Sequence, residues 1–253
     1  MNEALAELIS LGPEFLPVFY LVFLRVGAAM ALLPAFGEQM IPLRVRLSAI
    51  IAFTAIVAPI VADSAPTEVT LVHIFTEIGM GFALGFSLRL QIMALQVAAS
   101  IAAQVTSLSQ LLGGAAVDPQ PAMGVILLLA ALALAAALGL HVQYAGMFVK
   151  SYDLIGFGAG FPASVFSPWA KEAVTAMFSF ALLLAMPFVA ASLLYNLALG
   201  VINRAMPQLM VAFVGAPAIT YGALVIFALS APILLTVWVE LFSNQITNPF
   251  GFR

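Results

Sequence analysis

Long apolar stretches, separated by short polar connections, account for most of the chain. A helix needs about 20 predominantly apolar residues to cross a hydrocarbon layer about 30 Å thick. Stretches that approach or exceed this length occupy residues 15–36, 47–61, 71–103, 122–140, 173–202 and 209–242. Pro187, Pro217 and Pro232 lie inside the last two stretches and are expected to bend or split them. The pattern predicts an all-α integral membrane protein with about six long, partly broken hydrophobic helices.

The connections between these stretches are short, except for residues 150–172, which we predict to form a long loop rich in glycine, proline and aromatic residues. No part of the chain has the mixed, charged composition of a soluble domain. Residues 1–253 are therefore expected to form a single membrane domain.

The composition supports contact with membrane lipid and excludes several classes of function. Hydrophobic residues make up 64% and charged residues 8% of the chain, against about 45–50% and about 25% in soluble domains. The eight Lys and Arg residues are scattered, whereas nucleic-acid binding needs clustered basic side chains. The absence of cysteine excludes disulfides and thiolate metal sites. The sequence also lacks a phosphate-binding loop, a nucleophile elbow and a cluster of metal ligands, so neither an enzyme nor a bound cofactor is expected.

Three charged residues, Arg25, Glu77 and Arg89, lie well inside the apolar stretches, and Glu240 lies near the end of the last stretch. Each charge costs roughly 2.5–3.5 kcal/mol on membrane insertion, so each needs a partner or a function. The three could line a proton or substrate pathway, or they could form ion pairs between helices or with partner subunits. The spacing of His73 and Glu77 also allows a hydrogen bond on one helix face. Pairing is the favoured interpretation, and Arg204, in a later connection, joins the three as a candidate subunit contact.

Uncharged polar residues follow one face of the helix predicted from residue 71 onward. Gln96, Ser100, Gln104 and Ser107 are spaced four, four and three residues apart, which places them on one side of a helix. Apolar residues occupy the opposite face: Leu95, Val97, Ile101, Val105 and Leu108. This polar stripe could face a water-filled conduit or could hydrogen-bond a neighbouring helix, and the residues alone leave both interpretations open.

A segment of small residues follows the polar stripe. It comprises Leu111, Leu112, Gly113, Gly114, Ala115, Ala116, Val117, Asp118, Pro119, Gln120 and Pro121. The two glycines permit backbone conformations that other residues resist, and Asp118-Pro119 stops a helix and fixes a turn. The segment could be a mobile plug or a plain connector, and the connector is the simpler interpretation.

Gly81 and Gly85 stand four residues apart in the stretch 71–103. This spacing is typical of membrane helices that approach one another closely. A dinucleotide site is not indicated, because no strand precedes the glycines and their spacing differs from that motif. We therefore predict close helix packing at Gly81 and Gly85.

Several short motifs occur in a characteristic order along the chain. They are Arg25-Val-Gly27, Pro34-Ala-Phe-Gly37, Ile41-Pro42-Leu-Arg44, Gly113-Gly114, Asp118-Pro119, Gly139-Leu-His141, Ser151-Tyr152, the run from Asn196 to Gln208, and Gly215-Ala-Pro217. In order and spacing, residues 15–240 resemble the FliR/SctT family of type III secretion export-gate proteins. The chain departs from the family pattern after Gln208, where an asparagine is lost, after Pro217, where a basic residue is absent, and at Gly156, where proline is usual.

The resemblance implies a subunit of the export gate in the flagellar basal body of the bacterial inner membrane. It implies assembly with FliP and FliQ, and with FlhB and FlhA, and passage of unfolded flagellar proteins. It also implies a FliP-like half over residues 1–120 and a FliQ-like half over residues 121–253. In the family the loop after the polar helix helps to close the pore, and this loop corresponds here to residues 107–121. The resemblance therefore favours the conduit interpretation of the polar stripe.

Two alternative functions stay open from the sequence. An injectisome export-gate protein would share the same fold. A stand-alone secondary transporter could use Arg25, Glu77 and Arg89 in its site, although the chain shows no convincing internal repeat of the kind found in transporters.

Overall fold

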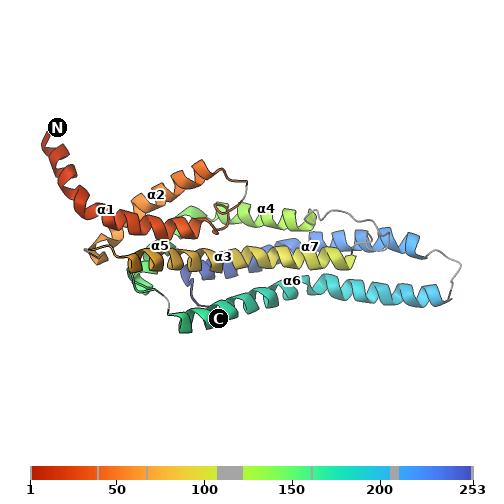
Figure 1. Cartoon of the computed structure of the whole chain (residues 1–253). Helices are drawn as coiled ribbons and strands as arrows, with labels where there is room; N and C mark the ends of the chain where they lie inside the picture. The colour runs from red at the N-terminus through yellow and green to blue at the C-terminus, as the bar shows by residue number, and fades with distance from the viewer. Residues whose placement is uncertain are drawn as a thin grey trace. The chain divides into compact units, whose positions relative to one another are not determined.

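The computed structural model describes the backbone of residues 2–38, 40–66, 68–106, 122–160, 162–205 and 211–251 (Figure 1). These residues form seven α-helices: α1 (Asn2–Met30), α2 (Leu43–Val61), α3 (Leu71–Thr106), α4 (Ala122–Ala137), α5 (Leu140–Leu154), α6 (Ala163–Ala205) and α7 (Val211–Thr247). A 3-10 turn, Ala62–Ser64, follows α2, and the described ranges contain no strand. The predicted all-α fold is confirmed.

Candidate membrane spans are numerous in the described part of the chain. Four helices are long and apolar enough to cross a bilayer: Leu43–Ser64, Leu71–Val105, Ala163–Ala205 and Ala218–Thr247. The pair Met123–Ala137 and Leu140–Leu154 adds a fifth if its two helices form one broken span. Large apolar side chains on these helices are exposed, as in Phe75 at 71% and Leu229 at 72%. Such a surface is stable against lipid or apolar protein, so the integral membrane character is confirmed.

The helix expected over residues 122–140 ends three residues earlier in the structure, at Ala137, and a separate helix, α5, begins at Leu140. Gly139, between α4 and α5, has φ 75°, a left-handed conformation that interrupts a right-handed helix and that glycine adopts at little cost. The loop expected over residues 150–172 is wrong for most of its length, because α5 extends to Leu154 and α6 begins at Ala163. α5 is short and carries polar residues, so a search for long apolar stretches does not find it.

The prolines that were expected to bend or split two of the helices do not split them. Pro187 lies inside α6, and Pro217 and Pro232 lie inside α7, and both helices are continuous. A membrane helix tolerates an internal proline because neighbouring groups and small local adjustments satisfy the freed carbonyl groups.

The chain divides into two compact units, each assembled from segments that are distant in the sequence. Unit 1 comprises Met1–Leu90, Ala135–Ala173 and Phe242–Arg253. Unit 2 comprises Gln91–Leu134 and Val174–Leu241. Each unit draws on both of the predicted halves, 1–120 and 121–253, and the FliP-like and FliQ-like character of those halves stays a prediction.

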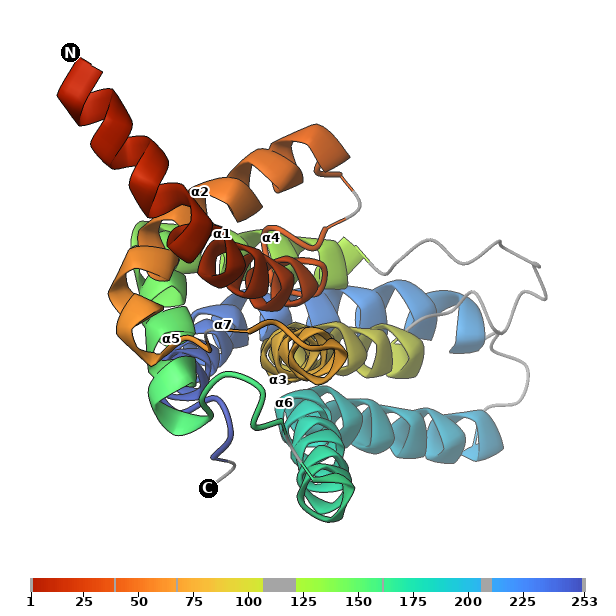
Figure 2. The ribbon, with the colours of Figure 1, turned by 60° about the vertical axis from the view of Figure 1, so that its left-hand side comes forward.

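Aromatic packing joins three elements of unit 1. α1 packs against α2, and α2 packs against α5 (Figure 2). The ring of Phe53 on α2 lies 5.8 Å from that of Phe36 and 6.0 Å from that of Phe148 on α5. The hydroxyl of Tyr144, also on α5, donates a hydrogen bond of 3.2 Å to the carbonyl of Pro34. The segment that follows α1 is thereby held against α2 and α5.

Gly81 and Gly85 bring α3 into close contact with α1. A Cβ atom added at Gly81 would collide with the carbonyl of Arg25, and one added at Gly85 would collide with the carbonyl of Ala29. Both obstacles are backbone atoms of α1, so a side chain at either glycine would separate the two helices. The packing role predicted for this glycine pair is confirmed.

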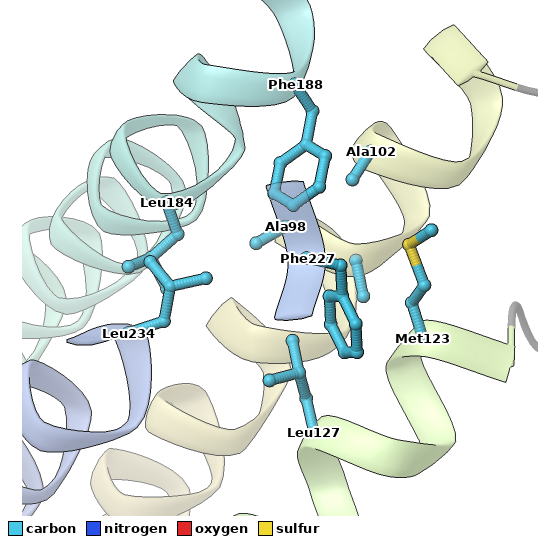
Figure 3. A pocket seen from close by; sticks show the side chains of 9 residues that line it. Ala98, Ala102, Met123, Leu127, Leu184, Phe188, Phe227 and Leu234 are labelled. Atoms are coloured by element: carbon cyan, nitrogen blue, oxygen red, sulfur yellow. The ribbon is translucent and has the colours of Figure 1, made fainter. Parts of the chain in front are cut away.

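Unit 2 packs parts of four helices around a small apolar cavity (Figure 3). Its volume is about 10 Å³. α3 contributes an alanine face, and α4, α6 and α7 contribute larger side chains; the lining residues are Ala98, Ala99, Ala102, Met123, Leu127, Leu184, Phe188, Phe227 and Leu234. A cavity of this composition offers water no polar partner, so it is expected to stay dry.

Candidate functional site

Arg25 of α1 and Glu77 of α3 form an ion pair inside unit 1. The Nε atom of Arg25 lies 2.7 Å from Oε2 of Glu77, and Nη2 lies 3.0 Å from Oε1. Both side chains are fully buried. This two-bond arrangement is the strongest that arginine and a carboxylate can form. Because both charges have left water, the pair is stable only if the remaining donors and acceptors also find partners.

The remaining donors of Arg25 bind the C-terminal end of α5. Nη1 donates to Oγ of Ser151 at 3.1 Å, and Nη1 and Nη2 both lie 3.2 Å from the carbonyl oxygen of Ile155. The guanidinium carbon lies 3.7 Å from the ring centroid of Tyr152, which is a cation–π contact. A positive charge at this point also opposes the partial negative charge at a helix C-terminus. Arg25 therefore connects α1 to α5 as well as to α3.

The carboxylate of Glu77 accepts two further hydrogen bonds. The hydroxyl of Tyr152 donates to Oε2 at 3.1 Å, and the backbone N–H of Gly158 donates to Oε1 at 3.3 Å. Gly158 has φ 72°, and an added Cβ atom there would collide with the ring of His73. His73 itself binds Thr70 through Nδ1, so the hydrogen bond considered between His73 and Glu77 is replaced by the pair with Arg25.

The buried cluster of Arg25, Glu77, Ser151 and Tyr152 joins α1, α3 and α5. Of the alternatives that the sequence left open, an ion pair between helices of the same chain is the one that the structure shows for Arg25 and Glu77. Their role in subunit contacts stays a prediction. The sequence identified both charges and contained Ser151-Tyr152 as a motif, but it gave no sign that the motif binds them.

Arg89, the third charge within an apolar stretch, also has a partner within the chain. Its Nη1 atom lies 2.6 Å from Oε1 of Glu38, and the two side chains are 26% and 19% exposed. Arg46 holds the same segment, because it donates to the carbonyls of Phe36 and Glu38 at 2.8 and 3.0 Å. Arg204, in contrast, is exposed in the last turn of α6. A subunit contact at Arg89 or Arg204 stays a prediction.

The polar stripe faces away from the packed interior of unit 2. Gln96 and Ser100 are half-buried and Gln104 is exposed, whereas Leu95 and Ala98, on other faces of α3, are buried. Within the described residues, the side chains of these three polar residues form no hydrogen bond. They are therefore available to water or to a partner chain.

Two of the predicted sites fall wholly or partly outside the described residues. Ser107, the last residue of the polar stripe, is one. The predicted plug, which includes Leu111, Leu112, Gly113, Gly114, Asp118 and Pro119, is the other.

Metal chemistry finds no support in the part of the chain that the structure describes. No group of three His, Asp or Glu side chains there is arranged to hold an ion. In unit 1 the carboxylate of Glu77 is already paired with the guanidinium of Arg25.

Comparison with known families identifies the chain. The model of the family described as bacterial export proteins, family 1, matches residues 16–245. The chain belongs to this family. The resemblance predicted from the ordered motifs is thereby confirmed.

Three relatives that share one name align with nearly the whole chain. The flagellar biosynthetic protein FliR of Caulobacter vibrioides is 33% identical over 227 residues, which is 87% of this chain and 90% of the relative. The proteins of that name from Bacillus subtilis and Escherichia coli are 26% and 28% identical, over 92% and 91% of this chain and 93% and 90% of the relatives. Together with the apolar helices, these matches make the chain a membrane-embedded component of flagellar export.

Proposed function

We propose that this protein is a subunit of the flagellar type III export gate and forms part of the channel through which unfolded flagellar proteins pass. The polar stripe carries this proposal. It places uncharged amide and hydroxyl groups on an outward face of α3, in a chain that belongs to an export family. In lipid these groups would lack partners, at a cost in free energy. A water-filled conduit would satisfy them.

An uncharged polar wall suits the transport of an unfolded polypeptide. Glutamine and serine side chains hydrogen-bond water and backbone groups, but they hold neither acidic nor basic side chains by strong ion pairs. A passing chain of any sequence is then retained only weakly. The buried cluster of Arg25 and Glu77 stabilises unit 1 and does not contact a passing polypeptide, because the two charges are paired with each other and buried.

The segment from Leu111 to Pro121 closes the conduit in this proposal. It follows the polar stripe in the sequence, and its residues Gly113–Ala116 have small side chains or none. A seal of small side chains can be displaced by an arriving polypeptide without the loss of many contacts. The partners are FliP and FliQ, with FlhB and FlhA adjoining, in the basal body of the inner membrane, and the subunit has no catalytic role.

Deletion of residues Gly113–Val117 tests the seal. Cells that carry the complete gate should then leak small ions or dyes across the membrane, while the chain still co-purifies with FliP and FliQ. If the deletion variant assembles and membrane conductance stays at the wild-type level, the seal is refuted, and the polar stripe is a subunit interface.

Purification of the chain alone separates the gate subunit from a stand-alone transporter. The polar stripe and the exposed Arg204 should leave the lone chain polydisperse in detergent, because their partners are missing. A monodisperse lone chain that carries a small solute into liposomes would contradict the gate assignment.

The flagellar gate is favoured over the injectisome gate because the three relatives are named as flagellar proteins. Restoration of motility in Caulobacter vibrioides cells that lack their own FliR tests this choice. Assembly with an injectisome gate but not with a flagellar gate would reverse it.

A further inference from the structure

Unit 1 contains an apolar groove between α3 and the start of α6. Its volume is about 550 Å³, within the range of about 300–1,000 Å³ that is usual for sites that hold a small molecule. Phe75, Gly79 and Phe82 are among the α3 residues that line it. Ala163 and Phe166 of α6 line the opposite wall. All the lining residues belong to unit 1, so one compact unit defines the groove.

Two glycines shape the groove. A Cβ atom added at Gly79 would meet no atom within 4 Å, so the space above this residue is open. Phe75 and Phe82 lie on the same face of α3 as Gly79 and are 71% and 51% exposed. They are seven residues apart, which is about 10 Å along the helix. Gly160, with φ 49°, lets the segment before α6 approach α3, because an added Cβ atom there would collide with Thr76. The result is an open trough with a glycine floor and aromatic sides.

The groove offers an occupant no polar side chain to bind. None of the described residues that line it is charged, and Thr76 is their single polar side chain. The hydroxyl of Thr76 is already used in its own helix, because it donates to the carbonyls of Val72 and His73 at 2.8 and 3.0 Å. A polar occupant would lose its hydration without finding partners in return. The chemistry of the lining therefore selects hydrocarbon.

The groove is continuous with the membrane-facing surface of α3. Leu71–Val105 is one of the candidate spans, and the exposed Phe75 and Ile78 belong both to its apolar surface and to the groove. A lipid tail in one leaflet is about 15 Å long, half of the hydrocarbon layer, so a large part of one tail fits along the groove. An extended polypeptide is a poor occupant, since its backbone groups would lack partners.

We propose that the groove binds one acyl chain of a membrane phospholipid as a resident part of the protein. The chain lies over Gly79, between Phe75 and Phe82, and contacts Phe166 from the side of α6. It fills space that the protein leaves between the two helices and joins them by dispersion contacts. The proposal goes beyond the export conduit and does not depend on it, because it uses only residues of unit 1 and the membrane character of the chain.

A photoreactive phospholipid with a diazirine midway along its acyl chain tests the proposal. It is loaded into membranes of cells that carry the complete export apparatus, and the chain is then purified in detergent with its partners. Light is applied either in the membrane or after detergent has replaced the free lipid, and mass spectrometry locates the cross-linked residues. Exposed leucines outside the groove, such as Leu183 and Leu229, report free lipid.

Both classes of residue should be cross-linked in the membrane. After the exchange into detergent, Phe75 and Phe82 should keep their label, whereas the reference leucines should lose theirs. Equal loss at the groove and at the reference leucines would refute a resident lipid. A groove that stays unlabelled in the membrane, while the reference leucines are labelled, would show that a helix of a partner covers it, and this result would also refute the proposal.

Matched leucine substitutions isolate the groove. Gly79→Leu fills it, and Gly146→Leu is the control on α5, where an added Cβ atom also meets nothing within 4 Å. Gly79→Leu should lower the label at Phe75 and Phe82 about tenfold, because the loss of two buried methylene groups already weakens binding by that factor. Gly146→Leu should leave it unchanged. Ala163→Leu, on the opposite wall, should act like Gly79→Leu.

Unchanged labelling in both groove variants would overturn the proposal. If neither variant assembles, the comparison before and after the exchange in the unmodified protein decides by itself. The proposed function fails separately, namely when deletion of Gly113–Val117 leaves the assembled gate without a leak.

Discussion

Arg25 and Glu77 lie 52 residues apart in the sequence, yet they form a fully buried ion pair with two hydrogen bonds between α1 and α3. The energetics of such a pair are asymmetric. Its net contribution against a well-packed apolar pair is small, because both charges lose their hydration. Removal of one partner, however, leaves the other charge buried and uncompensated.

Arg25→Leu or Glu77→Leu alone should lower the free energy of unfolding by about 3–5 kcal/mol. The double variant should lose less than the sum of the two, because no isolated charge remains. Thermal melting of the purified gate and the yield of assembled gate measure both effects, and loss of export should follow the loss of assembly. If either single variant assembled normally and lost only proton-coupled transport, the result would support a role of these charges in a secondary transporter instead.

The pair between Arg89 and Glu38 should contribute far less. Both side chains are partly exposed, so water and salt screen their attraction. Arg89→Ala is expected to change the free energy of unfolding by about 0–1 kcal/mol, measured by the same melting experiment. A loss comparable to that of Arg25→Leu would show that Arg89 is buried further in the assembled gate, as a subunit contact.

Gly81→Ala should destabilise the contact between α1 and α3. The new methyl group would collide with the carbonyl of Arg25, a backbone atom that cannot turn aside. Overpacking of this kind costs about 1–3 kcal/mol. Gly79→Ala is the control on the same helix, since an added Cβ atom there meets nothing within 4 Å. It should be neutral or should raise stability by up to about 1 kcal/mol through helix propensity.

The amount of each glycine variant in the membrane fraction, compared at equal synthesis, measures this difference. Equal levels for Gly81→Ala and Gly79→Ala would contradict the close approach of α1 and α3.

Gly158→Ala should weaken the hydrogen bond that the Gly158 N–H donates to Glu77. A left-handed conformation costs an alanine about 1–2 kcal/mol, and the methyl group would also meet His73. Gly156→Ala, two residues earlier, meets no atom within 4 Å and should be tolerated. Protease sensitivity of the segment after α5 compares the two, and equal sensitivity would show that the segment does not depend on Gly158.

Much of the fold follows from local properties of the sequence. A run of about 20 apolar residues can only satisfy its backbone groups in a membrane as a helix, so the membrane class and the positions of most helices are predictable. The packing role of Gly81 and Gly85 is also predictable, because their four-residue spacing marks a helix face without side chains whichever helix packs on it. The family is also predictable from the sequence, because its short motifs occur in a characteristic order.

The tertiary structure alone decided which groups meet. Glu77 has His73 one turn away and Arg25 far away in the sequence, yet it binds Arg25, because α1 and α3 pack at Gly81 and Gly85. Likewise, nothing near Val105 in the sequence indicates that Ser192 donates to its carbonyl. Periodicity reports the environment of a residue within its own helix, whereas these bonds depend on which helices lie side by side.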